Sequence, residues 1–475
     1  MTSGTIRFIF ENKIHEIINP DPNETILNYI RLKLKKNGTK EGCAEGGCGA
    51  CTVVIGELKK DNIIYKAINS CIAFITSLEG KQLLVVEDLM FEDGSLHPVQ
   101  NAMVNYHGSQ CGFCTPGFVM SLFSMYKNNT SYDIQTIEET ISGNLCRCTG
   151  YRPIIDAAKS LNQTKTDKFT KNKKKIIDQL KKIRPKSIFI QNKKYFAPRT
   201  VNELKKIIKK NPSLNFLSGG TDMSLIVTKQ KKDLENIIYL NSIDELNYIK
   251  DNNKHIEVGA TTPLRKFELF IKKYYSDFNI ILKRYGSVQI RNVATIAGNI
   301  ATASPIGDSL PLLLSLDASI VIENFSKKTI LPLKNFFISY RKTKLKKGQF
   351  ISAIRIPVFK KNIFKAYKIS KRIDDDISSV CASFNLSIEN KKIKNIKIAY
   401  GGMAPIPKRA THCEKTLLNS NFSEEIILKA QKSLEKDFQP INDMRASKNY
   451  RMEIAKNLLM KCFKEVKENK LIRLN

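Results

Sequence analysis

The 475-residue sequence contains no tryptophan and only five histidines, and the histidines form no cluster. A histidine-based metal centre is therefore not expected, and we expect each histidine to be structural or exposed. No run of about 18 apolar residues occurs, which excludes an evident transmembrane helix. The first residues, MTSGTIRFIFENK, lack the basic-then-apolar layout of a signal peptide, so we expect a cytoplasmic protein. A hydrophobic content of 42% with 26% charged residues excludes wholesale disorder.

Acidic residues are scarce in the last two thirds of the chain. Residues 1–160 contain 15 Lys and Arg against 17 Asp and Glu, whereas residues 161–475 contain 63 against 28. The overall net charge of +33 suggests nucleic acid or an anionic membrane as a partner. The lysines are scattered, however, and no tryptophan is present for base stacking. We therefore expect neither nucleic acid nor membrane binding, and we expect the first third to be a separate module.

Eight of the eleven cysteines lie in this nearly neutral first third. Cys43, Cys48, Cys51 and Cys71 have the C-x4-C-x2-C spacing plus a distant fourth cysteine that is typical of a plant-type [2Fe–2S] site. The alternatives are a zinc loop or buried thiols, but zinc ligands usually come as two C-x2–4-C pairs. The loop contains four glycines, which can turn backbone N–H groups toward cluster sulfur and raise its potential.

The second group of cysteines is two pairs, Cys111/Cys114 and Cys146/Cys148. Their spacing alone leaves zinc and [2Fe–2S] equally open. An apolar helix is predicted over Gly117–Asn128, a second begins within Tyr132–Ile141, and a third covers Tyr151–Leu161 with Pro153 in its first turn. Both pairs therefore lie in loops at one end of a small helical bundle.

The residues around the first group predict a small mixed sheet crossed by one helix, which is the β-grasp outline. Thr5–Phe10 and Lys13–Ile17 predict a hairpin, Thr52–Ile55 a strand, and Ile26, Leu27, Ile30 and Leu34 a helix face. Residues 161–187 hold ten basic and two acidic residues and predict a mostly solvated linker with a short helix near 176–183. A nucleic-acid-binding arm is the alternative, but KNKKK carries no aromatic residue for stacking.

The second module has no G-x-G-x-x-G after a strand, so it does not predict a Rossmann site. It does have small-residue turns after apolar runs, including Ser218-Gly219-Gly220-Thr221-Asp222 and the stretch SVQIRNVATIAGNIATASPIGD at 287–308. Backbone N–H groups and hydroxyls in such turns can bind a pyrophosphate, although small-residue turns are usually only turns.

The motifs EGCAEGGCGACTV, QCGFCTPGFVMS and GNLCRCTGYRPI resemble the iron–sulfur half of the xanthine dehydrogenase family of molybdenum hydroxylases. The resemblance implies that both cysteine groups bind [2Fe–2S] clusters, and that Gln110 lies beside the molybdopterin of the catalytic part. Cys381, Cys413 and Cys462 are expected to be buried small hydrophobic residues.

The later chain resembles the flavin domains of the same family through FLSGGTD, GATTPL, QIRNVATIAGNIATASPIGD, YRKT, KISKRIDDDIS, GGMAP and DMRAS. The resemblance implies an FAD site in which Phe216–Met223 and Thr295–Asn299 wrap the diphosphate and ribityl. Gly220 stands where animal members carry Asn. The complete set of implied FAD residues is Phe216, Leu217, Ser218, Gly219, Gly220, Thr221, Asp222, Met223, Tyr285, Thr295, Ile296, Ala297, Gly298, Asn299, Thr302, Asp308, Ile351 and Lys368.

The run Asp374-Asp375-Asp376 is by itself most typical of a solvated turn. The resemblance implies that Asp375 contacts nicotinamide in dehydrogenase forms, with Tyr340 near the same pocket. It therefore favours NAD⁺ over oxygen as the electron acceptor.

The expected fold is an α+β multidomain protein. Its predicted parts are a plant-type [2Fe–2S] β-grasp domain at 1–82, a helical [2Fe–2S] domain at 83–160, the basic linker at 161–187, a two-lobed FAD-binding domain at 188–358, and a carbon monoxide dehydrogenase flavoprotein-like C-terminal domain at 362–470.

The family resemblance implies an electron-transfer and FAD subunit of a xanthine dehydrogenase. Its molybdopterin would lie on a separate large subunit, in a dimer of heterodimers. Electrons from purine hydroxylation would pass through the second cluster, the first cluster and FAD to NAD⁺. The alternatives are a sister hydroxylase for an aldehyde or another N-heterocycle, and a zinc protein that binds nucleic acid.

Overall fold

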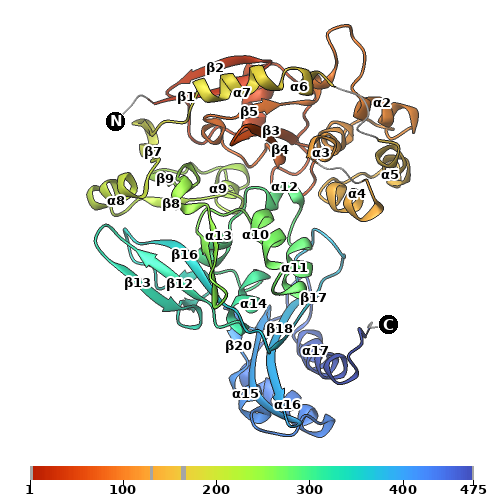
Figure 1. The fold of residues 1–475 in the computed structure, drawn as a ribbon, viewed down its shortest axis with the longest axis vertical. Coiled ribbons are helices and arrows are strands. Elements are labelled where there is room, and N and C mark those ends of the chain that lie inside the picture. Colours follow the sequence, from red (N-terminus) through yellow and green to blue (C-terminus); the bar gives the residue numbers. More distant parts are fainter. Residues whose placement is uncertain (1–3, 129–131, 162–166, 473–475) are drawn as a thin grey trace. The chain divides into compact units, whose positions relative to one another are not determined.

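The computed structural model describes residues 4–128, 132–161 and 167–472. The chain divides into two compact units, which are described separately (Figure 1). Unit 1 comprises Met1–Leu204, Ser213–Ile243 and Gly286–Ala294; unit 2 comprises Lys205–Pro212, Asp244–Tyr285 and Thr295–Asn475. Within the described ranges, no helix is long and apolar enough to cross a membrane.

Unit 1 begins with a five-stranded sheet in the order β2-β1-β5-β3-β4. The strands are β1 (Thr5–Phe10), β2 (Lys13–Ile18), β3 (Thr52–Lys59), β4 (Asn62–Asn69) and β5 (Gln82–Leu84). The predicted hairpin is confirmed, with Thr5 opposite Ile18, and β1 pairs in parallel with β5. The expected helix is present as the short α1 (Ile26–Asn28) followed by a π-helical turn, η1 (Tyr29–Lys33). This is the mixed sheet with one crossing helix that the sequence predicts.

Four helices follow the sheet: α2 (Pro98–Asn105), α3 (Thr115–Asn128), α4 (Ile134–Ile141) and α5 (Arg152–Lys159). Helix α3 is the centre of this bundle, because it contacts β3 and β4 as well as α2 and α4. Its side chains Phe118, Met120, Leu122 and Phe123 have no exposed area, which explains why its sequence is apolar on nearly every face. Helix α3 begins two residues before the predicted start.

The basic segment after the bundle differs from the expected solvated linker. It forms α6 (Lys168–Lys171) and α7 (Lys173–Lys182), and α7 contacts β1 and β4 (Figure 1). The apolar residues Phe169, Ile176, Leu180 and Ile183 are at most 7% exposed. The many lysines give this segment the composition of a solvated linker. Its apolar residues nevertheless share one side of the helices, and this side packs onto the rest of unit 1. Residues 162–166 of the predicted linker lie outside the described residues.

A second sheet completes unit 1, in the order β6-β7-β9-β8. Its strands are β6 (Ile188–Ile190), β7 (Tyr195–Ala197), β8 (Asn215–Leu217) and β9 (Ile237–Tyr239), with the short helices α9 (Ser224–Thr228) and α12 (Val288–Arg291). Ile188, Tyr195 and Leu217 belong to the same apolar core as Phe8 and Ile26. The first flavin lobe and the β-grasp sheet therefore share one core. Helix α8 (Val201–Lys210) crosses the division between the two units.

Unit 2 contains a five-stranded sheet in the order β10-β11-β16-β12-β13, a two-stranded sheet β14-β15 and a four-stranded sheet β17-β18-β19-β20. The strands are β10 (Ile249–Asp251), β11 (His255–Gly259), β12 (Ser319–Glu323), β13 (Lys328–Pro332), β14 (Phe337–Ser339), β15 (Lys342–Thr343), β16 (Phe350–Pro357), β17 (Ile363–Ile369), β18 (Val380–Glu389), β19 (Lys392–Gly401) and β20 (Lys408–Arg409). Every residue of helix α14 (Ser309–Ser315) is buried, and α14 contacts β18 and β19.

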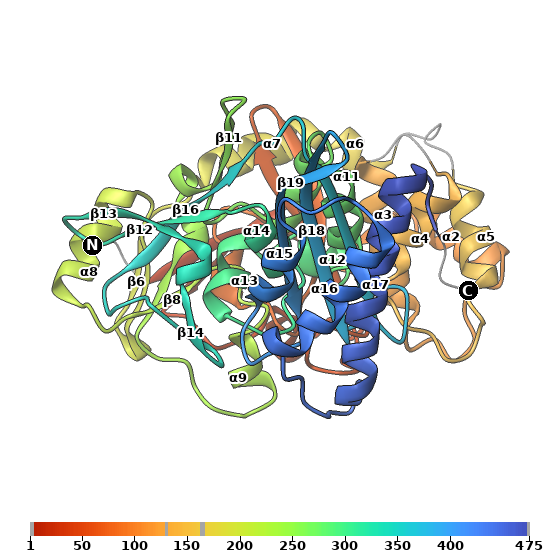
Figure 2. The ribbon, with the colours of Figure 1, turned by 90° about the horizontal axis from the view of Figure 1, so that it is seen from below.

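Six further helices belong to unit 2: α10 (Leu264–Ile271), α11 (Ser276–Lys283), α13 (Ile296–Thr302), α15 (Thr411–Leu417), α16 (Glu424–Asp437) and α17 (Lys448–Glu468). Helices α15–α17 share an apolar core with strands β18 and β19, and Figure 2 shows them gathered around these strands. The 3-10 turns of the chain are η2 (Ile75–Leu78), η3 (Val86–Leu89), η4 (Asn192–Lys194), η5 (Leu240–Ser242), η6 (Asp244–Leu246) and η7 (Leu333–Asn335).

Candidate metal centres and cofactor site

The first cysteine group, which we call the sheet-borne set, comprises Cys43, Cys48, Cys51 and Cys71. Cys51 Sγ lies 3.2 Å from Cys71 Sγ, and the Cys43 thiol is hydrogen-bonded with those of Cys48 and Cys71. These contacts with Cys48 and Cys71 lower the pKa of Cys43. Cys51 and Cys71 are 1% and 2% exposed, whereas Cys43 and Cys48 are partly exposed. The structure therefore brings all four predicted residues together, half in the core and half near the surface.

Hydrogen-bond donors surround the sheet-borne set. The Glu45 N–H donates to Cys43 Sγ at 3.5 Å, and Asn69 Nδ2 donates to Cys51 Sγ at 3.8 Å. The donor beside Cys43 comes from Glu45 rather than from a glycine. Gly49 has a φ of +70°, and a Cβ there would lie 2.2 Å from the Gly143 carbonyl oxygen. Only glycine fits at this close approach.

The second group, which we call the helix-end set, comprises Cys111, Cys114, Cys146 and Cys148. Cys148 Sγ lies 3.5 Å from Cys111 Sγ, and Cys114 is hydrogen-bonded with Cys146. Cys114 directly precedes α3, so the rigid helix fixes its position. Cys111 and Cys148 are exposed, and Cys114 and Cys146 are partly exposed. The four thiols are thus collected at one end of the bundle, as predicted.

Each set offers four thiols, which is the number of ligands that one [2Fe–2S] cluster takes, two on each iron. In both sets two of the sulfur atoms lie close together, at 3.2 and 3.5 Å. The residues present therefore fit a [2Fe–2S] cluster in each set.

The two cysteine loops are hydrogen-bonded to each other. The Leu145 N–H, adjacent to Cys146, donates to the Cys48 carbonyl oxygen at 2.9 Å. Asn144 Nδ2 donates to the Gly49 carbonyl oxygen at 3.0 Å, and the Asn144 side-chain oxygen accepts from Ser121 Oγ at 2.7 Å. Each cysteine loop therefore fixes the position of the other.

A short segment from the flavin sequence completes this junction, and sequence reasoning missed its role. Gln289 is 1% exposed, and its Nε2 donates to the Thr52 hydroxyl, the Ser121 hydroxyl and the Asn144 side-chain oxygen at 3.0–3.3 Å. Two residues on, the fully buried Arg291 forms an ion pair with Glu139 at 3.1 Å. Residues 286–294 therefore belong physically to the iron–sulfur part of the chain.

The predicted FAD residues fall in both units. In unit 1, Phe216 and Leu217 end strand β8, and the turn Ser218–Met223 leads into α9. A Cβ on Gly219 would lie 2.1 Å from the Val293 carbonyl oxygen, whereas Gly220, with φ +78°, would meet only Leu217 Cδ1 at 3.7 Å. The turn is therefore packed on one side and open on the other. Ser224 Oγ next to it is buried with no hydrogen-bond partner among the described residues, as expected beside a ligand site.

In unit 2, the predicted residues Thr295–Asn299 form the start of α13. Thr295 caps the helix by accepting a hydrogen bond from the Gly298 N–H at 3.1 Å. Asn299 Nδ2 donates to the Tyr285 hydroxyl at 2.7 Å, and its Oδ1 accepts from Ser309 Oγ at 2.6 Å. Thr302 Oγ1 donates to the Gly298 carbonyl oxygen, and so is used within the helix. Sequence reasoning passed over Thr261, a buried hydroxyl of the GATTPL turn without a partner in the described chain.

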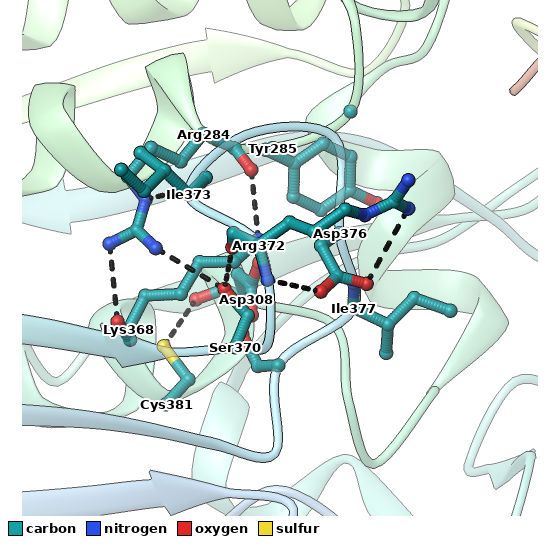
Figure 3. Close-up of polar contacts among 12 residues, drawn as sticks. Arg284, Tyr285, Asp308, Lys368, Ser370, Arg372, Ile373, Asp376, Ile377 and Cys381 are labelled. Atoms are coloured by element: carbon teal, nitrogen blue, oxygen red, sulfur yellow. Dashed lines mark hydrogen bonds and ion pairs between the residues drawn. The ribbon is translucent and has the colours of Figure 1, made fainter. Parts of the chain in front are cut away.

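Lys368 and Asp308, both predicted from the resemblance, form an ion pair at 2.7 Å, and both are at most 5% exposed (Figure 3). Asp308 also accepts a hydrogen bond from Ser378 Oγ at 2.5 Å, and Lys368 Nζ donates to the Arg284 carbonyl oxygen at 2.8 Å. A buried ion pair requires such additional hydrogen bonds, because desolvation of both charges is costly. Cys381 lies against Asp308 and is buried, as are Cys413 and Cys462.

The acidic run lies on the exposed loop that follows β17. Arg284 holds this loop through the Ile373 carbonyl oxygen at 2.7 Å and the Ser370 hydroxyl at 3.2 Å, and it also donates to the Lys368 carbonyl oxygen of β17 at 3.1 Å (Figure 3). Within the loop, the Arg372 N–H donates to the Asp376 carboxylate, and Arg372 Nη2 donates to the Asp375 carbonyl oxygen. Asp375 has a φ of +47°. Tyr340 is 61% exposed at the end of β14, whereas Ile351 in β16 is buried.

Four family profiles match the chain in the predicted order. They are a 2Fe-2S iron-sulfur cluster binding domain at 9–76, a [2Fe-2S] binding domain at 85–159, an FAD binding domain in molybdopterin dehydrogenase at 190–359 and a CO dehydrogenase flavoprotein C-terminal domain at 365–466. Xanthine dehydrogenase of Emericella nidulans is 32% identical over 91% of this chain, and xanthine dehydrogenase/oxidase of Rattus norvegicus is 29% identical over 92%. The chain belongs to the molybdenum hydroxylase family, as its iron–sulfur and flavin part.

This molybdenum hydroxylase chain spans just over a third of the length of those two relatives, 36% and 37%. Among solved structures, it is similar to carbon monoxide dehydrogenase from Hydrogenophaga pseudoflava, with a TM-score of 0.53 and 23% identity over 56% of this chain and 93% of that one. Quinoline 2-oxidoreductase from Pseudomonas putida 86 gives a TM-score of 0.54 and 18% identity over 58% and 98%. These likenesses establish the fold: the predicted α+β multidomain architecture is confirmed.

Proposed function

We propose that this chain is the electron-transfer and FAD subunit of a xanthine dehydrogenase, serving the hydroxylation of hypoxanthine or xanthine at a partner's molybdenum centre. The observation that carries the proposal is the junction of the two cysteine sets, which places the loop of one set within hydrogen-bond distance of the other. Relatives named xanthine dehydrogenase align with about nine tenths of the chain.

Within this proposal, the sheet-borne set and the helix-end set each hold one [2Fe–2S] cluster. The clusters would supply one-electron carriers, and FAD would supply the exchange between single electrons and a hydride. As the family resemblance implies, Phe216–Met223 and Thr295–Asn299 would bind FAD through backbone N–H groups. The buried Lys368–Asp308 pair would present a fixed positive and negative group to it. We propose the domain bounds that the sequence predicts, except that the basic segment packs on unit 1 as α6 and α7 instead of forming a solvated linker.

The proposed acceptor is NAD⁺, with Asp375 and Tyr340 as candidate contacts. Its support is the exposure of Tyr340 and the ordered loop geometry around Asp375. The test is anaerobic rapid mixing of the purified chain with NADH. Flavin bleaching supports NAD⁺ as the acceptor, whereas no bleaching together with rapid reoxidation of the reduced protein by oxygen supports an oxidase.

The proposed partner is a molybdopterin-binding large subunit in a dimer of heterodimers, located in the cytoplasm, without nucleic acid. Affinity purification from the native source tests this assembly. We expect a large molybdenum-containing protein in equal amount. Recovery of the chain bound to nucleic acid and free of molybdenum contradicts it.

The alternative role is the same electron transfer in a sister hydroxylase for an aldehyde or N-heterocycle. A substrate screen of the purified complex separates the two roles. The deciding measurement for the chain itself is low-temperature EPR of the reduced protein with metal and flavin analysis. We expect two distinct [2Fe–2S] signals and one releasable FAD. A colourless chain that contains zinc and gives no signal contradicts the proposal.

A further inference from the structure

Tyr151 has a backbone conformation that its side chain does not favour. Its φ is +67° and its ψ is −27°, which places it in the left-handed region directly before helix α5. Bulky residues avoid this region because their Cβ crowds the neighbouring carbonyl oxygen. A strained bulky residue persists only where the surroundings over-determine its position, and such residues cluster at functional sites. The question is which contacts hold Tyr151.

The contacts of Tyr151 converge on one cysteine of the helix-end set. The Tyr151 hydroxyl oxygen accepts a hydrogen bond from the Cys146 N–H at 2.9 Å. The Tyr151 ring packs edge-on against Phe118 of α3, with 6.2 Å between the ring centroids. The left-handed turn therefore directs the phenol back over the cysteine loop. It anchors the Cys146 backbone to the helical core.

The backbone of Tyr151 orders the same cysteine by a second route. The Tyr151 N–H donates to Thr149 Oγ1 at 3.2 Å. That hydroxyl lies 3.2 Å from Cys146 Sγ, and the Thr149 N–H donates to the same sulfur at 3.4 Å. Tyr151 thus contacts Cys146 at its backbone directly and at its sulfur through Thr149.

We propose that Tyr151 is a positioning residue for the cluster bound by the helix-end set, acting with Thr149 to fix the Cys146 thiolate and the hydrogen bonds that it receives. The inference rests on the proposed role of Cys146 as an iron ligand. Hydrogen bonds to ligand sulfur raise a cluster's potential, so the groups that order those bonds set it. The Tyr151 hydroxyl oxygen accepts the hydrogen bond of the Cys146 N–H, so this N–H does not donate to sulfur. Thr149 supplies two donors in its place.

The test is Tyr151→Phe in the full chain, which keeps the ring on Phe118 and removes only the hydroxyl. We expect a changed EPR line shape and an upward shift in potential for one [2Fe–2S] signal, because the released Cys146 N–H can turn to sulfur. The other signal serves as an internal reference and stays unchanged. Tyr106→Phe, at an exposed tyrosine of the same bundle, is the matched control and should alter neither signal.

A second pair of variants keeps the test decisive if Tyr151→Phe reduces iron binding. Thr149→Val removes the hydroxyl beside Cys146 Sγ and should lower the potential of the same signal, whereas Thr149→Ser keeps the hydroxyl and should restore it. Unchanged potentials and line shapes in Tyr151→Phe and Thr149→Val overturn the inference while leaving the proposed function intact. A wild-type chain without [2Fe–2S] signals would instead contradict the proposed function itself.

Discussion

The two cysteine sets each bring four thiols together, but they do so in different surroundings. In the sheet-borne set, Cys51 and Cys71 are at most 2% exposed and belong to an apolar cluster with Leu27 and Ile72. In the helix-end set, Cys111 and Cys148 are exposed, and the loops rest on helix starts and on Tyr151. Half of the first set lies within a core, whereas the second set lies on the surface of a core. Damage to the first should therefore unfold its module, whereas damage to the second should remain local.

The largest contrast is expected from serine substitution of one cysteine in each set. Cys71→Ser and Cys148→Ser should each remove about half of the iron and one EPR signal. Cys71→Ser should in addition lower the stability of the module by about 2–4 kcal/mol, because a hydroxyl replaces a buried thiol beside an apolar cluster. Cys148→Ser should leave the melting temperature nearly unchanged. Equal melting temperatures in calorimetry would remove the proposed distinction between the sets.

The stability of the helical bundle should fall strongly when the buried carboxylate of Asp167 is removed. Asp167 is 1% exposed and accepts hydrogen bonds from Lys127 at 2.9 Å, and it contacts His97 at 3.2 Å. Burial alone would raise its pKa, but His97, Lys127 and Thr170 hold the pKa of Asp167 well below its usual range. Asp167→Asn should cost about 3 kcal/mol at pH 7, since it leaves the Lys127 ammonium without its carboxylate partner.

The pH dependence follows from the direction of that shift. Because the folded-state pKa is depressed, the stabilisation is complete above the unfolded-state pKa near 4 and declines as the pH falls below it. Urea titrations at pH 7 and pH 3 should therefore show the difference between Asp167→Asn and wild type shrinking in acid. Asp156→Asn, a half-exposed carboxylate on α5, is the control, with an effect within about 0.5 kcal/mol. A difference that grows in acid would contradict this assignment.

The junction between the sets should be sensitive to a single methyl group. Gly49→Ala places a Cβ 2.2 Å from the Gly143 carbonyl oxygen, at a φ of +70°. We expect a loss of about 2–3 kcal/mol from overpacking and backbone strain together. Gly94→Ala has a φ of +81° with nothing within 4 Å, so it isolates the strain, at about 1 kcal/mol. Equal losses in denaturant unfolding would show that the contact with the second loop carries no energy.

The smallest effect on stability, and the most specific, is expected from Gln289→Leu. It removes the donor shared by Thr52, Ser121 and Asn144 and should cost roughly 1–2 kcal/mol. It should also change the magnetic interaction between the two reduced clusters, because this amide ties both loops together. Gln191→Leu, at an exposed glutamine, is the control. A stability loss without any change in the EPR interaction would restrict Gln289 to a structural role.

The sequence predicts the local features of both sets and few of the long-range ones. Cysteine spacing, the 5–18 hairpin and the apolar run of α3 are short-range signals, and the structure follows them. The sequence does not predict the packing of α7, because Ile176 and Leu180 lie between two runs of lysines in a segment that has the composition of a solvated linker. The position of Gln289 beside Asn144, 145 residues earlier in the chain, has no local signal. Lys368 and Asp308 are predicted as site residues only from the family resemblance. No pattern in the sequence predicts that they form an ion pair.

The division of unit 1 among three stretches of chain has a practical consequence for dissecting the protein. Residues 213–243 and 286–294 follow the basic segment in sequence, yet they supply strands β8 and β9 and the Gln289 amide to the unit that precedes it. A gene cut anywhere in 161–187 would thus yield an N-terminal fragment with an exposed apolar surface and a C-terminal fragment carrying the missing strands. Such fragments should be insoluble apart and should complement each other when co-expressed. The iron–sulfur part is consequently separable by redesign of the chain order, but not by truncation.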